Sequence, residues 1–516
     1  MARLDLFVPL DARDESLAAL AARALGWPRA EVGTVRVLRR ALDARKGRPL
    51  GHQLRLAVER ANEVAAAPAP CPALPRWPAG RPVPRVVVVG SGPAGAWAAL
   101  RLAEAGVPCT MLERGRAVQP RRRDLAALQK GRLDADSNYC FGEGGAGTYS
   151  DGKLYTRSKA RDGVAAVLAD LVRFGAPPEI EVEARPHVGS NRLPRVLSAL
   201  RAHLESLGVV YRFEADVAGL GLDHGRVRSI RLRDGDELPA EIVVLAVGHS
   251  ARSVYEWLAG AAPGAIERKD LAIGVRIEHP QPVIDAWQYG KAAGHPKLPP
   301  AFYELRAESG GRSVYSFCMC PGGWIVPAAT EADGVVVNGM SLSKRDSPFA
   351  NAGMVVSVRA ADFGPAAAGV LAGVRFQREI ERAAFRAGGG GFRAPAQRLV
   401  DFLVARASTR LPATSYRPGI VDADLAEILP GPIGGALREG LGALVSRFPL
   451  LAHPDAVLLG AETRTSAPVR LPRHATSLQS VAIAGMYPAG EGAGYAGGIV
   501  SAALDGARVA AAILDS

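Results

Sequence analysis

The sequence predicts an α/β protein built around a Rossmann-like dinucleotide-binding domain. Residues 86–115 read VVVVGSGPAGAWAALRLAEAGVPCTMLERG, in which a buried strand, a glycine turn, a helix and an acid-ended strand follow in order. A second glycine-rich turn leads into a helix of small residues at 490–514, and residues 276–454 carry no dinucleotide signature. These three observations predict a discontinuous dinucleotide domain with an inserted α+β substrate domain.

Residues 1–62 predict a small α+β module ahead of that domain. Its expected elements, from the spacing of apolar residues, are a strand at Leu4–Val8, a helix at Glu15–Leu25 and strands at Val35–Leu38 and Leu54–Val58. The β-α-β-β order resembles part of a ferredoxin-like fold. No cysteine precedes Cys71, so thiolates of this module cannot hold an iron–sulfur cluster. Residues 63–84 are rich in proline and predict an extended linker.

The first part of the dinucleotide domain is predicted at 85–275. The run Val86–Val89 suits a strand that is covered on both faces. Gly90 permits a tight turn, Gly92 lets backbone N–H groups approach a pyrophosphate, and Gly95 lets the following helix pack closely on the strand.

The ends of that helix and of the next strand supply further cofactor contacts. Pro93 and Ala94 open the helix, whose N-terminus presents free amides and a positive dipole end to phosphates. Glu113 ends the strand Cys109–Leu112 and is placed to accept hydrogen bonds from a ribose. Arg114 follows it and is assigned to the same site.

Several segments together resemble the glutathione-reductase-like FAD superfamily, in the branch that holds fumarate-reductase-like flavoproteins. More closely, the set resembles a family of uncharacterised bacterial FAD-dependent dehydrogenases, over nearly the whole chain. The motifs that carry this resemblance are FGEGGAG at 141–147, GHSAR at 248–252, YSFCMCPGG at 315–323, NGMS at 338–341, ETRTS at 462–466 and GEGAGYAGGI at 490–499.

The resemblance implies FAD as the cofactor and assigns further residues to it. The C-terminal part of the FAD domain is placed at 455–516, where Gly490 and Glu491 stand at the Gly-Asp position whose acid holds the flavin ribityl chain. The residues implied beside the flavin ring are Ala496, Gly497, Gly498 and Ile499. The other implied contacts are Gly144 and Gly145 along the pyrophosphate and flavin, Val217 against the adenine, and Gly248 at the end of the second FAD motif.

Three polar residues are the candidate catalytic groups. Arg464 lies in a donor-rich segment that leads to the flavin end, and it is the best candidate for binding an anion. Arg276 could anchor a carboxylate with two hydrogen bonds, or it could carry exposed charge on an edge strand. His279 could act as an acid or base, or it could be a structural residue before Pro280.

Two further groups allow more than one interpretation. Cys318 and Cys320 would share one face of a strand, as core residues or beside a ligand at the turn that follows. A redox dithiol at this spacing is uncommon, and no cysteines form the spaced pair that disulfide reductases place after the first strand and helix, so disulfide exchange through the flavin is not expected. A metal site would need more clustered ligands, so none is predicted. Asp151 and Lys153 follow the glycine-rich loop and lie either near the flavin or in a capping, solvated position.

Composition limits the class of protein and its partners. The chain has 516 residues, 48% of them hydrophobic, with no uninterrupted apolar run of membrane-spanning length and no signal-peptide core at the start, which predicts a cytoplasmic protein without a membrane partner. A net charge of +12 raises nucleic acid as a partner. The basic residues are spread along the chain, so a solvated surface is the favoured interpretation. The sequence does not address the oligomeric state.

The sequence therefore predicts an FAD-dependent oxidoreductase that transfers a hydride at flavin N5 to or from a small, anionic or unsaturated substrate. NAD(P)H is a candidate reductant, although 276–454 shows no second strand–GxGxxG–helix–acid unit. The alternatives are an RNA-modifying flavoprotein and a non-catalytic flavin-binding protein.

Overall fold

A computed structural model describes residues 1–12, 16–63, 76–156 and 158–516. The N-terminal module is a three-stranded antiparallel sheet with strand order β1-β3-β2 and one helix. Its elements are β1 (Ala2–Pro9), α1 (Leu17–Leu25), β2 (Val32–Asp43) and β3 (Gly51–Arg60). Since β1 and β2 both run antiparallel to β3, they and α1 form the split βαβ unit expected of part of a ferredoxin-like fold. The predicted linker falls largely on residues outside the described ranges.

A five-stranded parallel sheet forms the centre of the dinucleotide-binding domain, in the order β22-β10-β4-β5-β6. The predicted strands at 86–89 and 109–112 are β4 and β5. The valines of β4 alternate between two hydrophobic clusters, because both faces of the sheet are covered. Among the described residues, no second wholly parallel sheet of this kind is present.

The strands and helices of this domain occur in the predicted order along the chain. The strands of the parallel sheet are β4 (Val86–Val89), β5 (Cys109–Leu112), β6 (Val210–Arg212), β10 (Ile242–Leu245) and β22 (Met486–Pro488). The helices are α2 (Pro93–Glu104), α3 (Val118–Leu128), α4 (Arg161–Arg173), α5 (Leu193–Ser206), α6 (Arg252–Ala261) and α12 (Ile499–Leu514). A meander of β7 (Val217–Asp223), β8 (Arg226–Leu232) and β9 (Glu237–Pro239) and the pair β11 (Glu267–Arg268) and β21 (Val469–Arg470) complete it.

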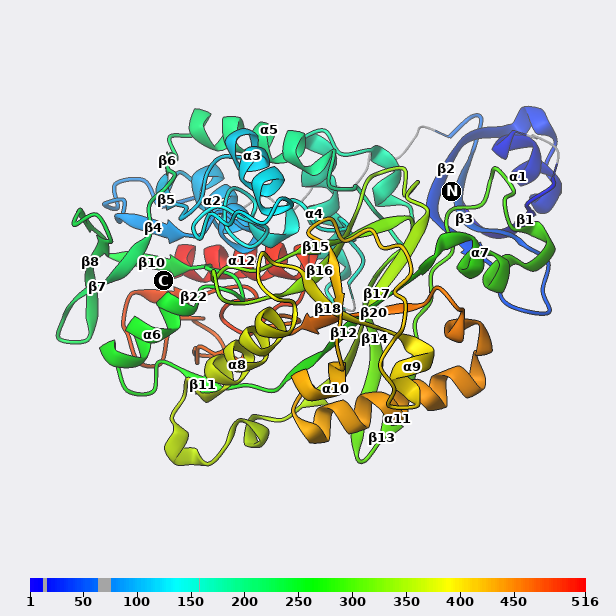
Figure 1. Ribbon diagram of the computed structural model, residues 1–516. Helices are drawn as coiled ribbons and strands as arrows, with labels where there is room; N and C mark the ends of the chain where they lie inside the picture. The colour runs from blue at the N-terminus through cyan, green and yellow to red at the C-terminus, as the bar shows by residue number, and fades with distance from the viewer. Residues whose placement is uncertain (13–15, 64–75, 157) are drawn as a thin grey trace.

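The helix α12 is far from α2 in sequence but lies against it (Figure 1). A Cβ on Gly506 of α12 would lie 1.9 Å from the carbonyl oxygen of Ala94, so glycine is required for this close approach. The contact joins the two separated parts of the dinucleotide domain around the first glycine turn.

The substrate domain is a seven-stranded mixed sheet in the order β13-β14-β17-β12-β20-β18-β19. Its strands are β12 (Leu271–Pro280), β13 (Arg306–Ser309), β14 (Arg312–Cys320), β17 (Phe349–Val358), β18 (Ala394–Arg398), β19 (Ile420–Asp422) and β20 (Val457–Glu462), with the separate hairpin β15 (Gly323–Pro327) and β16 (Val337–Ser341). Its helices are α7 (Gln281–Tyr289), α8 (Ala372–Ala387), α9 (Leu399–Leu403), α10 (Leu425–Ile428) and α11 (Gly431–Arg447).

The predicted domain boundaries at 275/276 and 454/455 need correction. Strand β12 begins at Leu271, and β20 runs to Glu462, so both belong to the substrate sheet that the predicted boundaries cut. The two strands pair with each other. The chain therefore enters the substrate domain through β12 and leaves it through the neighbouring strand β20. The long-range pairing that decides this boundary has no local sequence signal.

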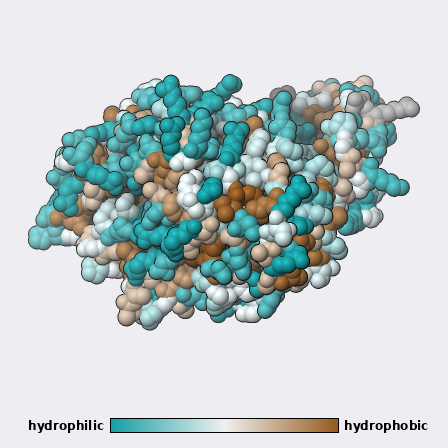
Figure 2. All heavy atoms as spheres, viewed as in Figure 1, coloured by the Kyte–Doolittle hydropathy of each residue, from teal (hydrophilic) through white to brown (hydrophobic). Residues whose placement is uncertain are grey.

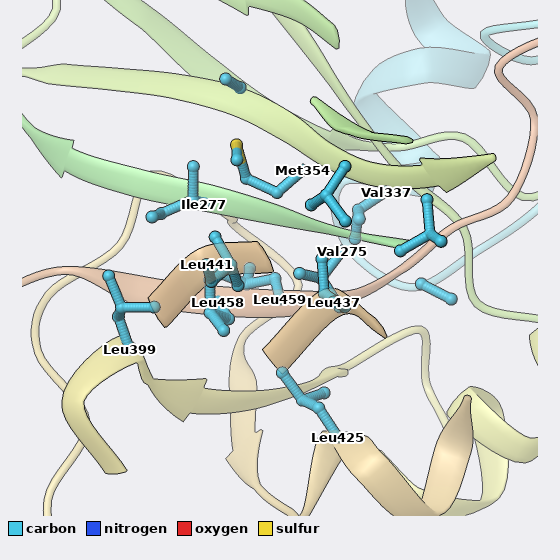
Figure 3. Packing of buried hydrophobic residues seen from close by; sticks show 14 of the residues in the cluster. Val275, Ile277, Val337, Met354, Leu399, Leu425, Leu437, Leu441, Leu458 and Leu459 are labelled. Carbon is cyan, nitrogen blue, oxygen red and sulfur yellow. The ribbon is translucent and has the colours of Figure 1, made fainter. Parts of the chain in front are cut away.

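The core of the substrate domain lies between its sheet and α11. Figure 3 shows Val275 and Ile277 of β12 and Leu458 and Leu459 of β20 around Leu437 and Leu441 of α11. Each of these six side chains is at most 1% exposed. Burial on this scale stabilises the sheet by about 1.5–3 kcal/mol per large apolar side chain.

The N-terminal module is docked on the rest of the chain. Arg40 of β2 exchanges backbone hydrogen bonds with Val182 and Ala184 (2.7 and 2.8 Å), and its guanidinium binds Glu183 at 2.6 Å. The module lies beside α7 at one end of the molecule (Figure 1). The side chain of Gln288 on α7 also donates to the Ala44 carbonyl at 3.0 Å.

The molecular surface in Figure 2 is mostly hydrophilic, with apolar residues gathered near the middle of the face shown. Among the described residues, no helix combines the length and the apolar character that crossing a membrane would require.

Candidate FAD and substrate site

One cavity of about 2850 Å³ lies where the three parts of the chain meet. It is lined by the glycine turns of the dinucleotide domain, by residues along most of β14 from Ser313 to Met319, and by Arg39–Arg45, His52 and Gln53 of the N-terminal module. A ligand pocket is typically about 300–1,000 Å³, so this cavity has room for a dinucleotide and a second ligand together. The N-terminal module therefore forms part of the site wall.

The first glycine turn has the geometry that a pyrophosphate requires. Gly90 has φ +97°, and a Cβ there would lie 2.4 Å from the Ala246 carbonyl oxygen. A Cβ on Gly95 would lie 1.9 Å from the Gly90 carbonyl oxygen, so Gly95 sets the close packing of α2 on β4 rather than lining the cavity. A Cβ on Gly92 would meet nothing nearer than 3.9 Å and would project into space that the cavity includes.

The N-terminus of α2 faces the same space. Gly92 is its N-cap and provides no side-chain cap, while Pro93 and Ala94 line the cavity. The first-turn amides and the positive helix end are thus available to a phosphate. This arrangement fits the predicted cofactor.

Glu113 lines the cavity at the end of β5 and already accepts four hydrogen bonds. One carboxylate oxygen accepts from the backbone N–H and hydroxyl of Ser91, at 3.0 and 2.6 Å. The other accepts from the amides of Gly115 and Gly142, both at 2.9 Å. A carboxylate has about four lone-pair sites, so a ribose hydroxyl would have to share one of them. The geometry shows a second role for Glu113, which is to hold the glycine-rich loop against β4.

The remaining predicted contacts of the first part divide into two groups. Arg114, Gly145, Val217 and Gly248 line the cavity. Gly144 does not: at φ +78° it turns the loop, and a Cβ there would lie 2.2 Å from side-chain atoms of Leu197 and Thr148. Gly144 therefore shapes the loop and does not line the cavity where FAD was predicted to contact it.

The C-terminal turn forms the opposite wall. Glu491, Ala496, Gly497, Gly498 and Ile499 line the cavity, and a Cβ on Gly497 or Gly498 would meet nothing within 4 Å. The backbone can therefore lie directly against a flat ring there.

Gly490 lies behind this turn rather than on the cavity surface. Its amide donates to Asp505 at 2.8 Å, and Asp505 also forms an ion pair with Arg473 at 2.6 Å, with both side chains 5% exposed. Asp505 itself lines the cavity, and neither it nor Arg473 was among the predicted residues. A lone acid in the middle of a small-residue helix gives no signal of this role, because its partner lies outside that helix.

Glu491 is the residue whose charge is most sensitive to the cofactor. Burial raises its pKa to about 7, against the opposing effect of the Lys269 ammonium. A ribityl hydroxyl that donates to this carboxylate would stabilise its charged form and lower that pKa.

We therefore expect FAD affinity to depend on pH through Glu491. The ionised form binds better, so affinity should be constant above the free pKa and should weaken by up to about tenfold per pH unit below it. Fluorescence titration of FAD into apoprotein, at roughly pH 6 to 8.5, measures this. Glu491→Gln should bind more weakly at high pH and lose the dependence; a wild-type affinity that does not change with pH would contradict it.

Arg464 lines the cavity, but its guanidinium is already committed to an ion pair. Its Nε and Nη2 donate to the carboxylate of Glu381 at 3.1 and 2.8 Å, and its Nη1 donates to the Thr330 hydroxyl at 2.6 Å. Arg252 binds the same carboxylate at 2.7 and 2.9 Å. The Arg252–Glu381–Arg464 cluster is buried and joins the two domains, which corrects the predicted role of Arg464 as a free anion clamp.

Arg276 and His279 do not reach the cavity. Arg276 is 0% exposed on a central strand, and its donors are used by Glu462 (2.8 and 3.0 Å), by Asn351 (2.7 Å) and by the Cys318 carbonyl (2.7 Å). Both predicted roles, a substrate anchor and an exposed edge-strand charge, are thus wrong. His279 is also 0% exposed; its Nε2 lies 2.9 Å from the Leu451 carbonyl, and burial lowers its pKa to about 4. It belongs to the core.

Asp151 and Lys153 are the polar pair that the fold brings to the cavity. Asp151 accepts from Arg345 at 2.8 Å and from the Ser341 hydroxyl, and so ties the glycine-rich loop to the substrate domain. Lys153 donates to the Met319 carbonyl and lies 3.9 Å from the sulfur of Cys318. Asp151 is 1% exposed, so the solvated, capping interpretation does not hold.

Tyr303 is a further cavity residue without a sequence motif. It is 3% exposed and lines the cavity, and its hydroxyl has no hydrogen-bond partner among the residues that the structure describes. Burial raises its pKa, so the hydroxyl stays protonated, and the oxygen itself is buried. In the same described ranges, no group of three His, Cys, Asp or Glu side chains is arranged to hold a metal ion.

Three family models match parts of the chain. Residues 270–465 match the model described as "FAD-dependent protein, C-terminal domain-like", and residues 84–128 match an FAD binding domain. Residues 2–59 match a domain of unknown function. An uncharacterised protein of Clostridium beijerinckii is 45% identical over 436 residues, which are 84% of this chain and 81% of that protein.

Solved structures resemble the chain more distantly. The halogenase PltM is 11% identical, with a TM-score of 0.37 over 83% of this chain and 67% of that one. CtdE in complex with FAD is 12% identical, with a TM-score of 0.33 over 83% and 84%. Tetracycline destructase Tet(51) is 11% identical, with a TM-score of 0.28 over 54% of this chain and 57% of that one. At these scores the likenesses carry no argument about activity.

Proposed function

Because the chain belongs to the family of FAD-dependent proteins that includes its Clostridium beijerinckii relative, we propose that it is an FAD-dependent oxidoreductase acting on a small organic substrate. The observation that carries the proposal is the continuous cavity, which runs from the glycine turns to the substrate sheet. A flavin that was only structural would not need the second half of this space. Bound FAD supplies hydride transfer at N5.

The glycine walls of the cavity would hold FAD. Gly92 and the N-terminus of α2 would bind the pyrophosphate, Val217 would lie near the adenine, and Gly497 and Gly498 would contact the ring. The positive N-terminus of α12 would stabilise negative charge on that ring. Glu491 would accept a hydrogen bond from the ribityl chain.

The substrate would occupy the part of the cavity lined by Lys153, Tyr303 and Cys318. The Lys153 ammonium would favour an anionic group, in the role that the sequence suggested for Arg276 and Arg464, although it already lies 3.7 Å from the Asp151 carboxylate. The Tyr303 ring would pack against the substrate, because its hydroxyl oxygen is itself buried. These residues orient the substrate; they need not transfer a proton.

The test is an anaerobic visible spectrum of the FAD-loaded protein during addition of NADH and then NADPH. We expect an oxidised flavin band that one nucleotide bleaches within seconds, which would identify the reductant. Flavin that neither nucleotide reduces would exclude nicotinamide as the electron donor. A protein that retains no FAD after reconstitution would contradict the proposal itself.

The charged rim of the cavity does not favour the RNA-modifying alternative. Arg40, Arg45 and Arg185 line the cavity, but each is paired with a carboxylate, at 2.6, 2.5 and 3.0 Å respectively. Such pairing removes these three arginines as free contacts for a phosphate backbone. A cytoplasmic location stays an expectation from the sequence.

A further inference from the structure

Cys318 and Cys320, here called the thiol pair, occupy an irregular end of β14. Phe317 pairs with Gly353 of β17, but the next pair is Cys320 with Asn351, so the bulged strand carries one extra residue. Cys318 has φ +45°, a conformation that non-glycine residues rarely adopt. Bulges of this kind redirect side chains and are common beside active sites. At this bulge Cys318 lines the cavity, whereas Cys320 lies in the interior.

The two cysteines contact each other and two cations. The Cys320 thiol donates a hydrogen bond to the Cys318 carbonyl oxygen at 3.4 Å, and the Lys153 ammonium lies 3.9 Å from the Cys318 sulfur. Arg276 Nη2 lies 3.6 Å from the Cys320 sulfur and 2.7 Å from the Cys318 carbonyl. The neighbouring Cys320 thiol, followed by the Lys153 and Arg276 cations, lowers the pKa of the Cys318 thiol, whereas burial raises that of Cys320. The Lys153 ammonium therefore favours the thiolate form of Cys318, while the buried Cys320 keeps its proton.

The pair is placed between the cavity and the protein interior. Cys318 lines the cavity and is partly exposed, whereas Cys320 lies behind it at 0% exposure. Cys318 and Glu491 line the same cavity, so the sulfur borders the space that the FAD wall encloses. An accessible thiolate with a buried second thiol is the arrangement of a nucleophilic and a resolving cysteine.

We propose that Cys318 and Cys320 form a redox-active thiol pair that exchanges two electrons with bound FAD and reduces a disulfide compound in the cavity. This inference rests on the proposed function, because FAD is the electron partner. Lys153 already pairs with Asp151, and Arg276 already pairs with Glu462. A thiol pair that becomes negatively charged explains why each cation also contacts a sulfur.

The steps balance in both half-reactions. The Cys318 thiolate attacks one sulfur of the disulfide, forming a mixed disulfide, and the departing thiolate takes the Cys320 proton. The Cys320 thiolate then attacks the Cys318 sulfur, releases the second thiolate and closes the Cys318–Cys320 disulfide. Reduced FAD, as its monoanion, transfers two electrons and its proton to that disulfide, which restores thiolate and thiol and leaves oxidised FAD.

The experiment counts electrons in the oxidised FAD-loaded protein by anaerobic dithionite titration. Wild-type protein should take up two electron pairs per FAD before full reduction, and Cys318→Ser and Cys320→Ser should take up one. Cys109→Ala is the matched control, because Cys109 is another buried thiol whose pKa burial raises to about 12; it should still take up two.

A second readout needs no variant and no activity. Wild-type protein is alkylated in its oxidised and in its reduced state and digested, and the masses of the peptides are measured by mass spectrometry. The peptide with both cysteines should be unlabelled and lighter by two hydrogen atoms when oxidised, and labelled first at Cys318 when reduced. With dithiobis(nitrobenzoate) as the disulfide probe, Cys320→Ser should stop at a mixed disulfide on Cys318.

The outcomes separate the two proposals. Uptake of a single electron pair by wild-type protein, with both cysteines alkylated in the oxidised state, would overturn the thiol pair and leave the flavoenzyme intact. Uptake of two electron pairs per FAD, with a Cys318–Cys320 disulfide in the oxidised state that disappears on reduction, supports both. Absence of bound flavin would overturn both.

Discussion

Gly92→Val is expected to give a folded protein that no longer retains FAD. A Cβ at this position would enter the space where the turn meets a pyrophosphate, and its nearest protein neighbour is 3.9 Å away. The two γ-methyl groups would occupy that space and cover the first-turn amides of α2. We expect the dissociation constant for FAD to rise at least about a hundredfold, which corresponds to ~2.7 kcal/mol.

The measurement is the flavin-to-protein absorbance ratio after reconstitution, with a fluorescence titration for affinity. Gly435→Val is the matched control, because Gly435 is an exposed residue of α11 with nothing within 4 Å of its Cβ position. Thermal unfolding of both apoproteins should resemble that of the wild type, since neither change creates a clash. Retention of normal FAD content by Gly92→Val would show that the pyrophosphate binds elsewhere.

Glu381→Gln is expected to lower stability more than any other conservative change discussed above. The carboxylate is 1% exposed and accepts hydrogen bonds from both Arg252 and Arg464. Glutamine keeps the shape but removes the charge, so the buried Arg464 guanidinium loses its counter-ion and Arg252 keeps only Glu331, at 3.3 Å. Breaking a buried ion pair in this way costs about 3–5 kcal/mol.

Urea denaturation of the FAD-loaded protein measures the loss as a lower midpoint. Asp333→Asn provides the comparison. Asp333 pairs at 2.7 Å with Arg382, which follows Glu381 on α8, and both side chains of this pair are about half exposed. An exposed pair is worth about 0–1 kcal/mol. If the two variants unfold at the same midpoint, the buried cluster does not stabilise the contact between the domains.

The local parts of the fold were predictable from the sequence. Val86–Val89, the turn from Gly90 to Gly95 and the strand Cys109–Leu112 lie where their patterns placed them, because each depends on neighbours within a few residues. Glycine patterns are especially informative when a Cβ would clash or enter a ligand's space. For this reason most predicted FAD contacts line the cavity, whereas Gly95, Gly144 and Gly490 support it from behind.

The polar residues of the site were harder to predict, since their roles depend on distant partners. Arg276 alternates with apolar residues, a pattern typical of a strand with one exposed face. Its partner Glu462 lies 186 positions away, so the local pattern could not indicate that Arg276 is buried. The density of donors around Arg464 suggested an anion site, and the anion is the protein's own Glu381. Cys318 was assigned to a regular strand, whereas a bulge and its contact with Lys153 place it at the cavity.

The contact between α2 and α12 has a consequence for how the cofactor is loaded. During synthesis β4 and α2 emerge early, but β22 and α12 emerge only after the entire substrate domain has been made. Until then the parallel sheet ends at β10, and the surface of α2 around Ala94 is uncovered. A nascent chain can therefore form the phosphate turn but not the wall that would contact the ring. Cofactor insertion would follow translation, and FAD supply would limit how much of the finished chain becomes active.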